Sequence, residues 1–448
     1  MITRLTRRSF LASTAALATL APAAARGQAQ AARFLDATDF GVLPGIDATE
    51  PMRKAVTAAA AAGGSLFLPA GAYAMGEIEL PAGLVVEGAH GATTIIAVGD
   101  APIFIATQAQ AITLRDLALD GGGTGANVES PGLVTFRRCA GFQLQRLELR
   151  NGGASGIHLE ACAGHIGDCV VRGFSEGIFS LDARGLIVER NLIADCANGA
   201  IRIWASAENG NVDGTLVAGN DIRDIRTDAG GSGQNGNGIN IYRANGVMVT
   251  ANRLRNCAFS AIRVNAGSNT IISGNTCLDS GEVAIFSEFG FSGSVIADNI
   301  IDRAAQGISI TNFDQGGRLA TCTGNIVRNI APSSRVNPDT TAIGIFAEAD
   351  AVIASNVVEA VPGLGIGAGW GPYLRNVALT GNLVRDVEIG IGVSVADGAG
   401  RAAVTGNVIA EARRAGIAGL AWREMVSDDL VRDAPRFPLV SISGNSVG

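Results

Sequence analysis

Asparagine recurs in one sequence frame along most of the chain, and this frame limits the fold more than any other feature. From residue 110 onward the chain repeats with an irregular period of 22 to 38 residues. Most repeats place one apolar residue three positions before the asparagine and another two positions after it, as Val188 and Ile193 do around Asn191. A repeat of this length predicts a structure built from stacked, similar units. The recurring asparagines are Asn191, Asn220, Asn252, Asn275, Asn299, Asn325, Asn356, Asn382, Asn407 and Asn445.

A second pattern, Gly-Ile followed by alternating side chains, comes after the asparagine at a variable distance. Examples are Gly156-Ile157-His158-Leu159 and Gly238-Ile239-Asn240-Ile241. We therefore predict an all-β chain folded as a single-stranded, right-handed parallel β-helix with three strands per coil. The asparagine marks the turn between the second and third strands, where stacked side-chain amides are expected to form a hydrogen-bonded ladder. The leucine spacing of leucine-rich repeats and the ~40-residue blades of a propeller are absent.

The N-terminal part of the chain resembles the pectate-lyase-like superfamily of right-handed parallel β-helices. Asp39-Phe40-Gly41 precedes a helix that we expect to be capped by Thr49 and stopped by Gly63-Gly64. A Gly-Gly-x-x-x-x-Pro-x-Gly-x-Tyr pattern ending at Tyr73 and an apolar strand ending at Gly88 follow. The resemblance implies a β-helix with a short N-terminal capping helix. It implies no catalytic residue.

The first 31 residues resemble a bacterial twin-arginine (Tat) export signal. Arg7-Arg8 is followed by Phe10-Leu11 and a modest apolar run to Ala25, which is too short and too poor in large apolar residues for a membrane anchor. We expect cleavage after Ala29-Gln30-Ala31 or Ala23-Ala24-Ala25. The predicted division is a signal at 1–31, a cap with the first coils at 32–109, and repeats at 110–448. This layout is similar to a family of Tat-translocated repetitive β-helix proteins of undefined activity, and it implies a periplasmic or secreted protein.

Composition excludes several classes of protein. The formal net charge is -7, whereas a nucleic-acid binder would show a basic stripe. Lys54 is the only lysine, so a Schiff-base enzyme is not expected, and no P-loop motif is present. After the signal, no apolar run is long enough to enter a membrane. We expect a monomer that needs no cofactor.

Seven cysteines fall on positions that the repeat assigns mostly to the core. Their number is odd and no Cys-x-x-Cys motif occurs, so we interpret them as small buried apolar residues and predict no zinc site. Cys139 and Cys162 lie in matching Cys-Ala-Gly turns one coil apart. Whether these two form a disulfide is left open by the sequence.

Outward positions of the Gly-Ile strands carry the candidate site. Because side chains alternate along a strand, the residue after the isoleucine and the one two positions later point away from the core. Four consecutive coils then present a polar and aromatic cluster beside long insertions at 205–213 and 226–237. Aromatic rings, amides and guanidinium groups suit an acidic polysaccharide, although β-propensity alone also favours such residues on an exposed strand. The cluster comprises Arg202, Trp204, Asn240, Tyr242, Arg243, Arg263, Asn265 and Glu288.

Two classes of function stay open at this point. In an enzyme, Tyr242 or Arg263 would take the proton beside a uronate carboxylate that Arg202 neutralises, with Glu288 as the acidic member of the set. Glu288 and Glu160 are about 24 Å apart, too far for the carboxylate pair of a glycosidase. A loop carboxylate close to Arg263 or Tyr242 would favour a lyase or hydrolase. The alternative is a noncatalytic carbohydrate-binding or structural repeat protein.

Several catalytic signatures of related β-helix enzymes are missing. The chain lacks the Asn-Thr-Asp, Asp-Asp and His-Gly set of polygalacturonases and the Asp-Pro-His motif of alginate epimerases. It also lacks the clustered acids that would bind Ca²⁺ in a pectate lyase. The sequence therefore predicts an exported β-helix whose partners are a polysaccharide or oligosaccharide and the Tat machinery, with no metal site.

Overall fold

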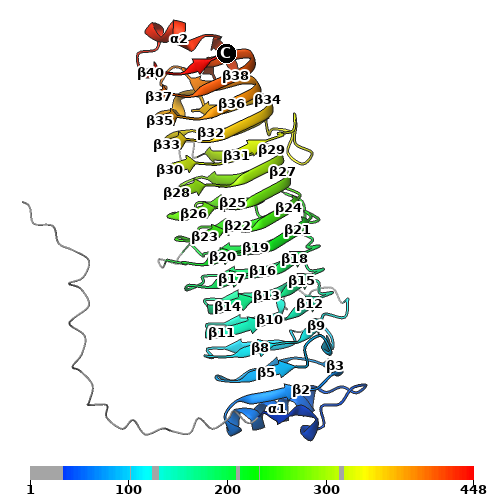
Figure 1. The fold of residues 1–448 in the computed structure, drawn as a ribbon. Helices are drawn as coiled ribbons and strands as arrows, with labels where there is room; N and C mark the ends of the chain where they lie inside the picture. The colour runs from blue at the N-terminus through cyan, green and yellow to red at the C-terminus, as the bar shows by residue number, and fades with distance from the viewer. Residues whose placement is uncertain (1–33, 101, 124–130, 208–211, 232, 312–316) are drawn as a thin grey trace, which may run out of the picture.

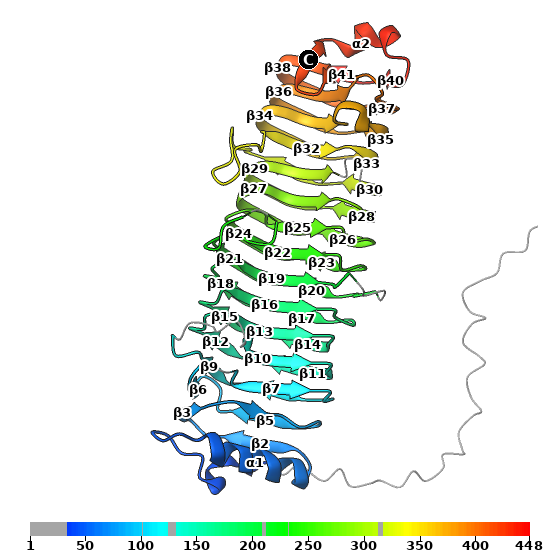
Figure 2. The same ribbon diagram turned by 180° about the vertical axis from the view of Figure 1, so that it is seen from behind.

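The computed structural model describes residues 34–100, 102–123, 131–207, 212–231, 233–311 and 317–448. The described chain forms one stack of coils that runs from α1 (Thr49–Ala62) to α2 (Leu430–Asp433) (Figures 1 and 2). Each strand pairs in parallel with the equivalent strand of the next coil, apart from one short antiparallel pair near the C-terminus. Together with the right-handed rule for parallel crossovers, this confirms the predicted right-handed parallel β-helix.

One sheet of sixteen strands contains the strand that precedes each recurring asparagine and the equivalent strands of the N-terminal coils. Its strands are β1 (Leu35–Asp36), β2 (Ser65–Leu68), β5 (Val85–Gly88), β8 (Thr113–Arg115), β11 (Ala140–Gln145), β14 (Ala163–Gly167), β17 (Ile187–Glu189), β20 (Leu216–Ala218), β23 (Met248–Thr250), β26 (Thr270–Ser273), β28 (Ser292–Ala297), β30 (Arg318–Thr323), β33 (Ala349–Ala354), β35 (Arg375–Thr380), β37 (Ala402–Thr405) and β40 (Val440–Ser443).

The other two strands of each coil belong to a second sheet of 25 strands. The strands that directly follow the asparagine position are β3 (Gly71–Met75), β6 (Thr93–Ala97), β9 (Ala118–Asp120), β12 (Glu148–Arg150), β15 (Val170–Arg172), β18 (Leu192–Ala194), β21 (Asp221–Ile225), β24 (Arg253–Cys257), β31 (Ile326–Arg328) and β41 (Ser446–Val447). The Gly-Ile strands and their N-terminal equivalents are β4 (Ile78–Glu79), β7 (Phe104–Thr107), β10 (Gly132–Arg137), β13 (Ser155–Glu160), β16 (Glu176–Leu181), β19 (Gly199–Trp204), β22 (Asn237–Tyr242), β25 (Ile262–Asn265) and β32 (Ile343–Ala347).

In several coils these two strands run together as one long, bent strand. The long strands are β27 (Thr276–Glu288), β29 (Ile300–Thr311), β34 (Val357–Ala368), β36 (Leu383–Ser394) and β38 (Val408–Ala421), and β39 (Glu424–Ser427) pairs antiparallel with β38. The 3-10 turns are η1 (Ala37–Phe40), η2 (Gly371–Tyr373) and η3 (Ala434–Arg436).

The asparagine ladder is present along the whole repeat. Each side-chain Nδ2 donates to the Oδ1 of the asparagine in the next coil at 2.9–3.0 Å, from Asn191 to Asn445. The same Oδ1 also accepts the backbone N–H of the preceding asparagine, as Asn220 does for Asn191. A second Nδ2 bond reaches a backbone carbonyl one coil back. All of these groups are therefore satisfied although nearly all are buried.

The interior is a continuous column of aliphatic side chains. The residues three before and two after each asparagine, such as Val188 and Ile193, are buried in every coil except the last, as the repeat predicts. All seven cysteines are buried and free in the structure. The turns of Cys139 and Cys162 are stacked, and the Cys139 backbone N–H lies 3.4 Å from the Cys162 Sγ.

The N-terminal cap differs from the prediction by one residue. Ala48 occupies the cap position of α1, and Thr49 is the first helical residue, with its N–H and hydroxyl both bound to Asp47. Gly63 ends the helix in the left-handed conformation at a φ of 107°, as expected for a helix-terminating glycine. The expected signal at 1–31 lies outside the described residues. Within the described ranges, no helix has the length and apolar character of a membrane span.

Candidate functional site

The candidate site is the outer surface of the Gly-Ile strands β13, β16, β19, β22, β25 and β27, which we call the Gly-Ile face. Parallel pairing places equivalent residues of successive coils side by side, and two outward columns result. One column runs through His158, Phe179, Arg202, Asn240, Arg263 and Phe286. The other runs through Glu160, Leu181, Trp204, Tyr242, Asn265 and Glu288. The structure thus brings together the residues that the sequence predicted as a cluster.

Four aromatic side chains form a continuous row on this face. His158 stacks on Phe179 with ring centroids 4.9 Å apart, and Phe179 meets Trp204 edge to face at 5.4 Å. Trp204 in turn meets Tyr242 at 5.7 Å. All four rings are half-buried, so each keeps part of its surface open. The indole N–H of Trp204 donates to Asn240 Oδ1 at 2.7 Å, which fixes the ring orientation.

Arg263 is held by two carboxylates. Its Nε and Nη2 donate to Glu288 Oε1 and Oε2 at 2.7 and 3.0 Å, and its Nη1 reaches Glu282 Oε2 at 3.3 Å. Arg263 is 7% exposed, Glu288 4% and Glu282 2%. Asn265 Nδ2 also donates to Glu288 Oε1, at 3.0 Å. The guanidinium is therefore committed to internal ion pairs, and its plane covers Phe286.

Glu282 is a member of this cluster that the sequence analysis missed. It lies in β27 at the bend before the outward positions, three residues ahead of Ile285. Asn337 Nδ2 donates to its other oxygen at 2.7 Å, and the Ser334 hydroxyl donates to the carbonyl of Gly281 at 2.7 Å. The insertion at 331–341 thus closes over the cluster. The sequence did contain a signal for Glu282, namely a charged residue directly after Gly281. The repeat frame, however, does not predict whether this position faces the core or the outside.

The insertion at 226–237, as far as it is described, covers the middle of the Gly-Ile face. Arg202 Nη2 donates to Asn235 Oδ1 at 2.9 Å, and Asn240 Nδ2 donates to the carbonyl of Gly233 at 2.8 Å. Arg202 also pairs with Glu176 at 3.2 Å. Burial lowers the pKa of Arg202, and the Glu176 carboxylate opposes this shift. Arg202, Asn240, Arg263 and Glu288 therefore point away from the core, as predicted, but loops and ion pairs bury them, which the sequence did not predict.

Tyr242 and Arg243 are the accessible end of the predicted cluster. Tyr242 is half-buried and Arg243 is exposed. The Arg243 guanidinium carbon lies 4.9 Å from the centre of the Tyr242 ring, within cation–π range. Arg243 is thus a cation on the Gly-Ile face that stays open to solvent, next to an aromatic surface.

His158 begins the aromatic row beside a charged pair. Its Nε2 lies 3.1 Å from Glu160 Oε1, and Glu160 also accepts from Arg137 Nε at 3.1 Å. Burial lowers the pKa of the His158 imidazole, while the neighbouring Glu160 carboxylate opposes the shift. At neutral pH the ring is therefore uncharged and presents a flat surface that continues the row.

Together, the fold and this face define a right-handed parallel β-helix with an aromatic row on its Gly-Ile strands. A model of the family described as periplasmic copper-binding protein (NosD) matches residues 122–276. This match spans 155 of the 448 residues. No curated protein matches the chain.

Several solved structures resemble the chain at low sequence identity. The N-terminal fragment of bacteriophage Phi29 gene product 12 superposes with a TM-score of 0.51 at 14% identity, covering 92% of this chain and 66% of that one. The catalytic unit of a GH87 α-1,3-glucanase from Streptomyces thermodiastaticus gives 0.47 at 15% identity, covering 92% and 68%. The A-module of mannuronan C-5 epimerase AlgE4 from Azotobacter vinelandii gives 0.44 at 16% identity, covering 73% and 96%.

The described residues do not fit the metal named in the family description. Nowhere in the described ranges do three His, Cys, Asp or Glu side chains gather where they could hold a metal ion. His158 and His165 each bind a glutamate instead. The Cys139 and Cys162 thiols lie in the core against backbone carbonyls. We therefore derive no chemistry from copper.

Proposed function

We propose that the protein is exported and binds an acidic polysaccharide along the Gly-Ile face. The observation that carries this proposal is the unbroken aromatic row from His158 to Tyr242, which ends beside the exposed Arg243. The row crosses four coils and so extends over ~14 Å, long enough for an oligosaccharide segment. Partly exposed aromatic rings are suited to stacking on sugar rings, and the guanidinium is suited to a uronate carboxylate.

Internal ion pairing favours binding over catalysis. The mechanism considered from sequence needs Arg202 to neutralise a substrate carboxylate, but this guanidinium already binds Glu176 and Asn235. Arg263 is likewise committed to Glu288 and Glu282. A buried charge that has exchanged water for protein partners leaves them only at a large energetic cost. These arginines therefore support the shape of the face, and ligand contact falls to the aromatic row and Arg243.

Polysaccharide cleavage is the second candidate, because two carboxylates contact the buried Arg263 guanidinium, although neither is the loop carboxylate expected from the sequence. Two carboxylates, Glu282 and Glu288, lie on different sides of one guanidinium. Both come from β27, however, and the 331–341 insertion closes over them. Cleavage would require this insertion to move away so that a glycan reaches the carboxylates.

Two observations support export: the sequence of the first 31 residues, and the match of residues 122–276 to a family described as periplasmic. The paired arginines Arg7-Arg8 before an apolar run are the signal that we propose the Tat machinery reads.

A glycan-binding panel tests the proposal directly. Uronate-containing and neutral polysaccharides are screened by affinity electrophoresis against the wild type and the Tyr242→Ala and Trp204→Ala variants. Loss of one stacking ring is expected to weaken binding at least tenfold, about 1.4 kcal/mol. Trp422→Ala is the matched control, because Trp422 is an exposed aromatic residue that packs on Trp370 in the C-terminal region. Equal binding by all three variants, or no binding by the wild type, would contradict the proposal.

The same samples separate binding from cleavage. Ultraviolet absorbance reports unsaturated uronate from a lyase, and a reducing-end assay reports hydrolysis. Binding without either product supports a noncatalytic role. Product formation that is lost in Glu282→Gln but retained in the exposed Glu148→Gln variant would establish the enzyme instead.

A further inference from the structure

On the outer surface of the sixteen-stranded sheet, the positions four and two residues before each asparagine carry no charge over the C-terminal nine strands, from β20 to β40. None of these eighteen side chains is charged, aromatic or buried. The charged residue Asp350, at an earlier outward position of β33, pairs with Arg375 at the edge of this surface. We call this surface the uncharged face. Its residues are Leu216, Ala218, Met248, Thr250, Ile271, Ser273, Val295, Ala297, Thr321, Thr323, Val352, Ala354, Ala378, Thr380, Ala403, Thr405, Ser441 and Ser443.

Strand propensity alone does not explain the absence of charge. The same sheet carries Glu87, Arg115 and Glu189 at equivalent outward positions in its N-terminal coils. The neighbouring sheet of the same C-terminal coils carries outward Arg255, Arg328 and Arg385. Charged side chains are thus tolerated on strands elsewhere in this molecule, and their exclusion is specific to the uncharged face.

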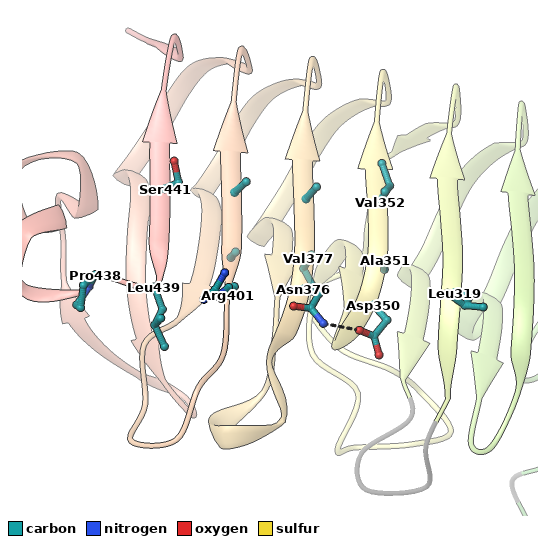
Figure 3. Close-up of a pocket in the computed structure, with 13 residues that line it drawn as sticks. Leu319, Asp350, Ala351, Val352, Asn376, Val377, Arg401, Pro438, Leu439 and Ser441 are labelled. Atoms are coloured by element: carbon teal, nitrogen blue, oxygen red, sulfur yellow. Dashed lines mark hydrogen bonds between the residues drawn. The ribbon is translucent and has the colours of Figure 1, made fainter.

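The C-terminal part of the uncharged face is hollowed into an apolar groove of about 780 Å³. Val352, Ala378 and Ala403 are among the residues that line it. Leu319 and Leu439 lie along the side where the strands begin (Figure 3). Leu319 is 59% exposed and Leu439 48%. Asp350, Asn376 and Arg401 give the same side a polar rim, with Asn376 Nδ2 donating to Asp350 Oδ1 at 2.9 Å. An apolar centre with a polar rim is the usual anatomy of a protein–protein interface.

The size of the uncharged face matches that of a stable interface. Nine strands extend over ~38 Å along the axis, since neighbouring strands are ~4.8 Å apart. The eighteen outward residues and the exposed leucines at the rim approach the 20–30 residues, ~800 Å² per partner, of a standard protein interface.

We propose that two copies of this chain pack together through the uncharged face. A second copy presents the same uncharged surface, so no charge is buried unpaired, and twofold symmetry covers both faces at once. Two flat sheets can pack face to face at ~10 Å with their aliphatic side chains interdigitated. A glycan fits less well, because the face offers no aromatic ring for stacking. The proposal replaces the sequence-based expectation of a monomer, and it is independent of the glycan-binding proposal because the two surfaces lie on different sheets.

Light scattering coupled to size-exclusion chromatography tests the dimer on the full chain over a range of protein concentrations. One chain weighs 45.6 kDa, and a species of twice this mass is expected. The Val295→Arg/Val352→Arg variant places charge at two residues that are 38% and 39% exposed, and it should elute as a monomer. The matched control is Ile96→Arg/Val98→Arg, with exposures of 37% and 44% near the N-terminal cap, and it should remain a dimer.

Circular dichroism and thermal melting identify any variant that fails to fold, and Val352→Glu alone then replaces the double variant. A wild-type protein that stays monomeric at every concentration overturns the proposal. So does a dimer that survives folded Val295→Arg/Val352→Arg, which would place the interface elsewhere. A copurifying protein that replaces the second copy on this face also overturns it.

Discussion

Arg263 and Glu288 face each other across adjacent coils and join through two parallel hydrogen bonds, at 2.7 and 3.0 Å. The fork of the guanidinium matches the two carboxylate oxygens, which is the strongest geometry for such a pair. Water is almost excluded from both groups, and Glu282 completes the shell. The pair therefore joins two coils beneath the 331–341 insertion. We expect it to contribute measurably to the free energy of unfolding.

Replacement of Arg263 by methionine should lower the free energy of unfolding by about 3 to 5 kcal/mol. The variant leaves the Glu282 and Glu288 carboxylates buried without their cation, and such uncompensated charges cost this much. Urea unfolding followed by circular dichroism measures the change. The control is Arg255→Met, which alters an exposed arginine of the preceding strand β24 and should change stability by about 0.5 kcal/mol or less. Similar losses in both variants would show that the cluster has no special structural role.

Substitution of a ladder asparagine should destabilise the protein most in the middle of the ladder. Asn299→Ala removes the acceptor of both the Asn275 N–H and the Asn275 side-chain amide, each bound at 3.0 Å. Leaving two buried donors unsatisfied should cost about 2 to 6 kcal/mol. At the end of the ladder Asn445 is only partly buried, and water can replace its bonds, so Asn445→Ala should cost about 1 kcal/mol or less. Thermal melting compares the two variants, and equal shifts would contradict a cooperative ladder.

Stability should fall as the pH drops through the range in which histidine gains a proton. Burial lowers the pKa of His158 below its ordinary value of 6.5, so the unfolded chain binds the proton first. The contribution of the neutral ring is therefore complete above about pH 6.5 and is lost as the pH falls toward the lower, folded-state pKa. Urea midpoints at about pH 7.5 and pH 5 should differ more for the wild type than for His158→Phe, which keeps the stack on Phe179 but cannot titrate. If the urea midpoint changes equally with pH in both proteins, His158 is not the source of the pH dependence.

The sequence predicted those parts of the structure that follow from periodicity. The positions of Asn299 and its equivalents, the apolar core and the two outward columns all depend on a side-chain repeat of two residues and a coil-to-coil repeat. The burial of Arg202 and Arg263 could not be derived in this way. It depends on the paths of the 226–237 and 331–341 insertions, which have no counterpart in neighbouring coils. Aperiodic loops are placed by tertiary contacts, and a periodic frame carries no information on them.

The seven cysteines should be unreactive in the folded protein and fully reactive after unfolding. All are buried and free, so Ellman's reagent should detect no thiol in the native state and seven in denaturant. Cys139 and Cys162 deserve a separate variant because their thiols are hydrogen-bonded, which lowers the pKa of Cys139 and raises that of Cys162. A thiol must be accessible to react with the reagent, and both of these thiols are buried in the core. The Cys139→Ala/Cys162→Ala protein should give five thiols in denaturant. If the wild type also gives five, the two stacked cysteines form a disulfide after export and the free pair seen in the structure is contradicted.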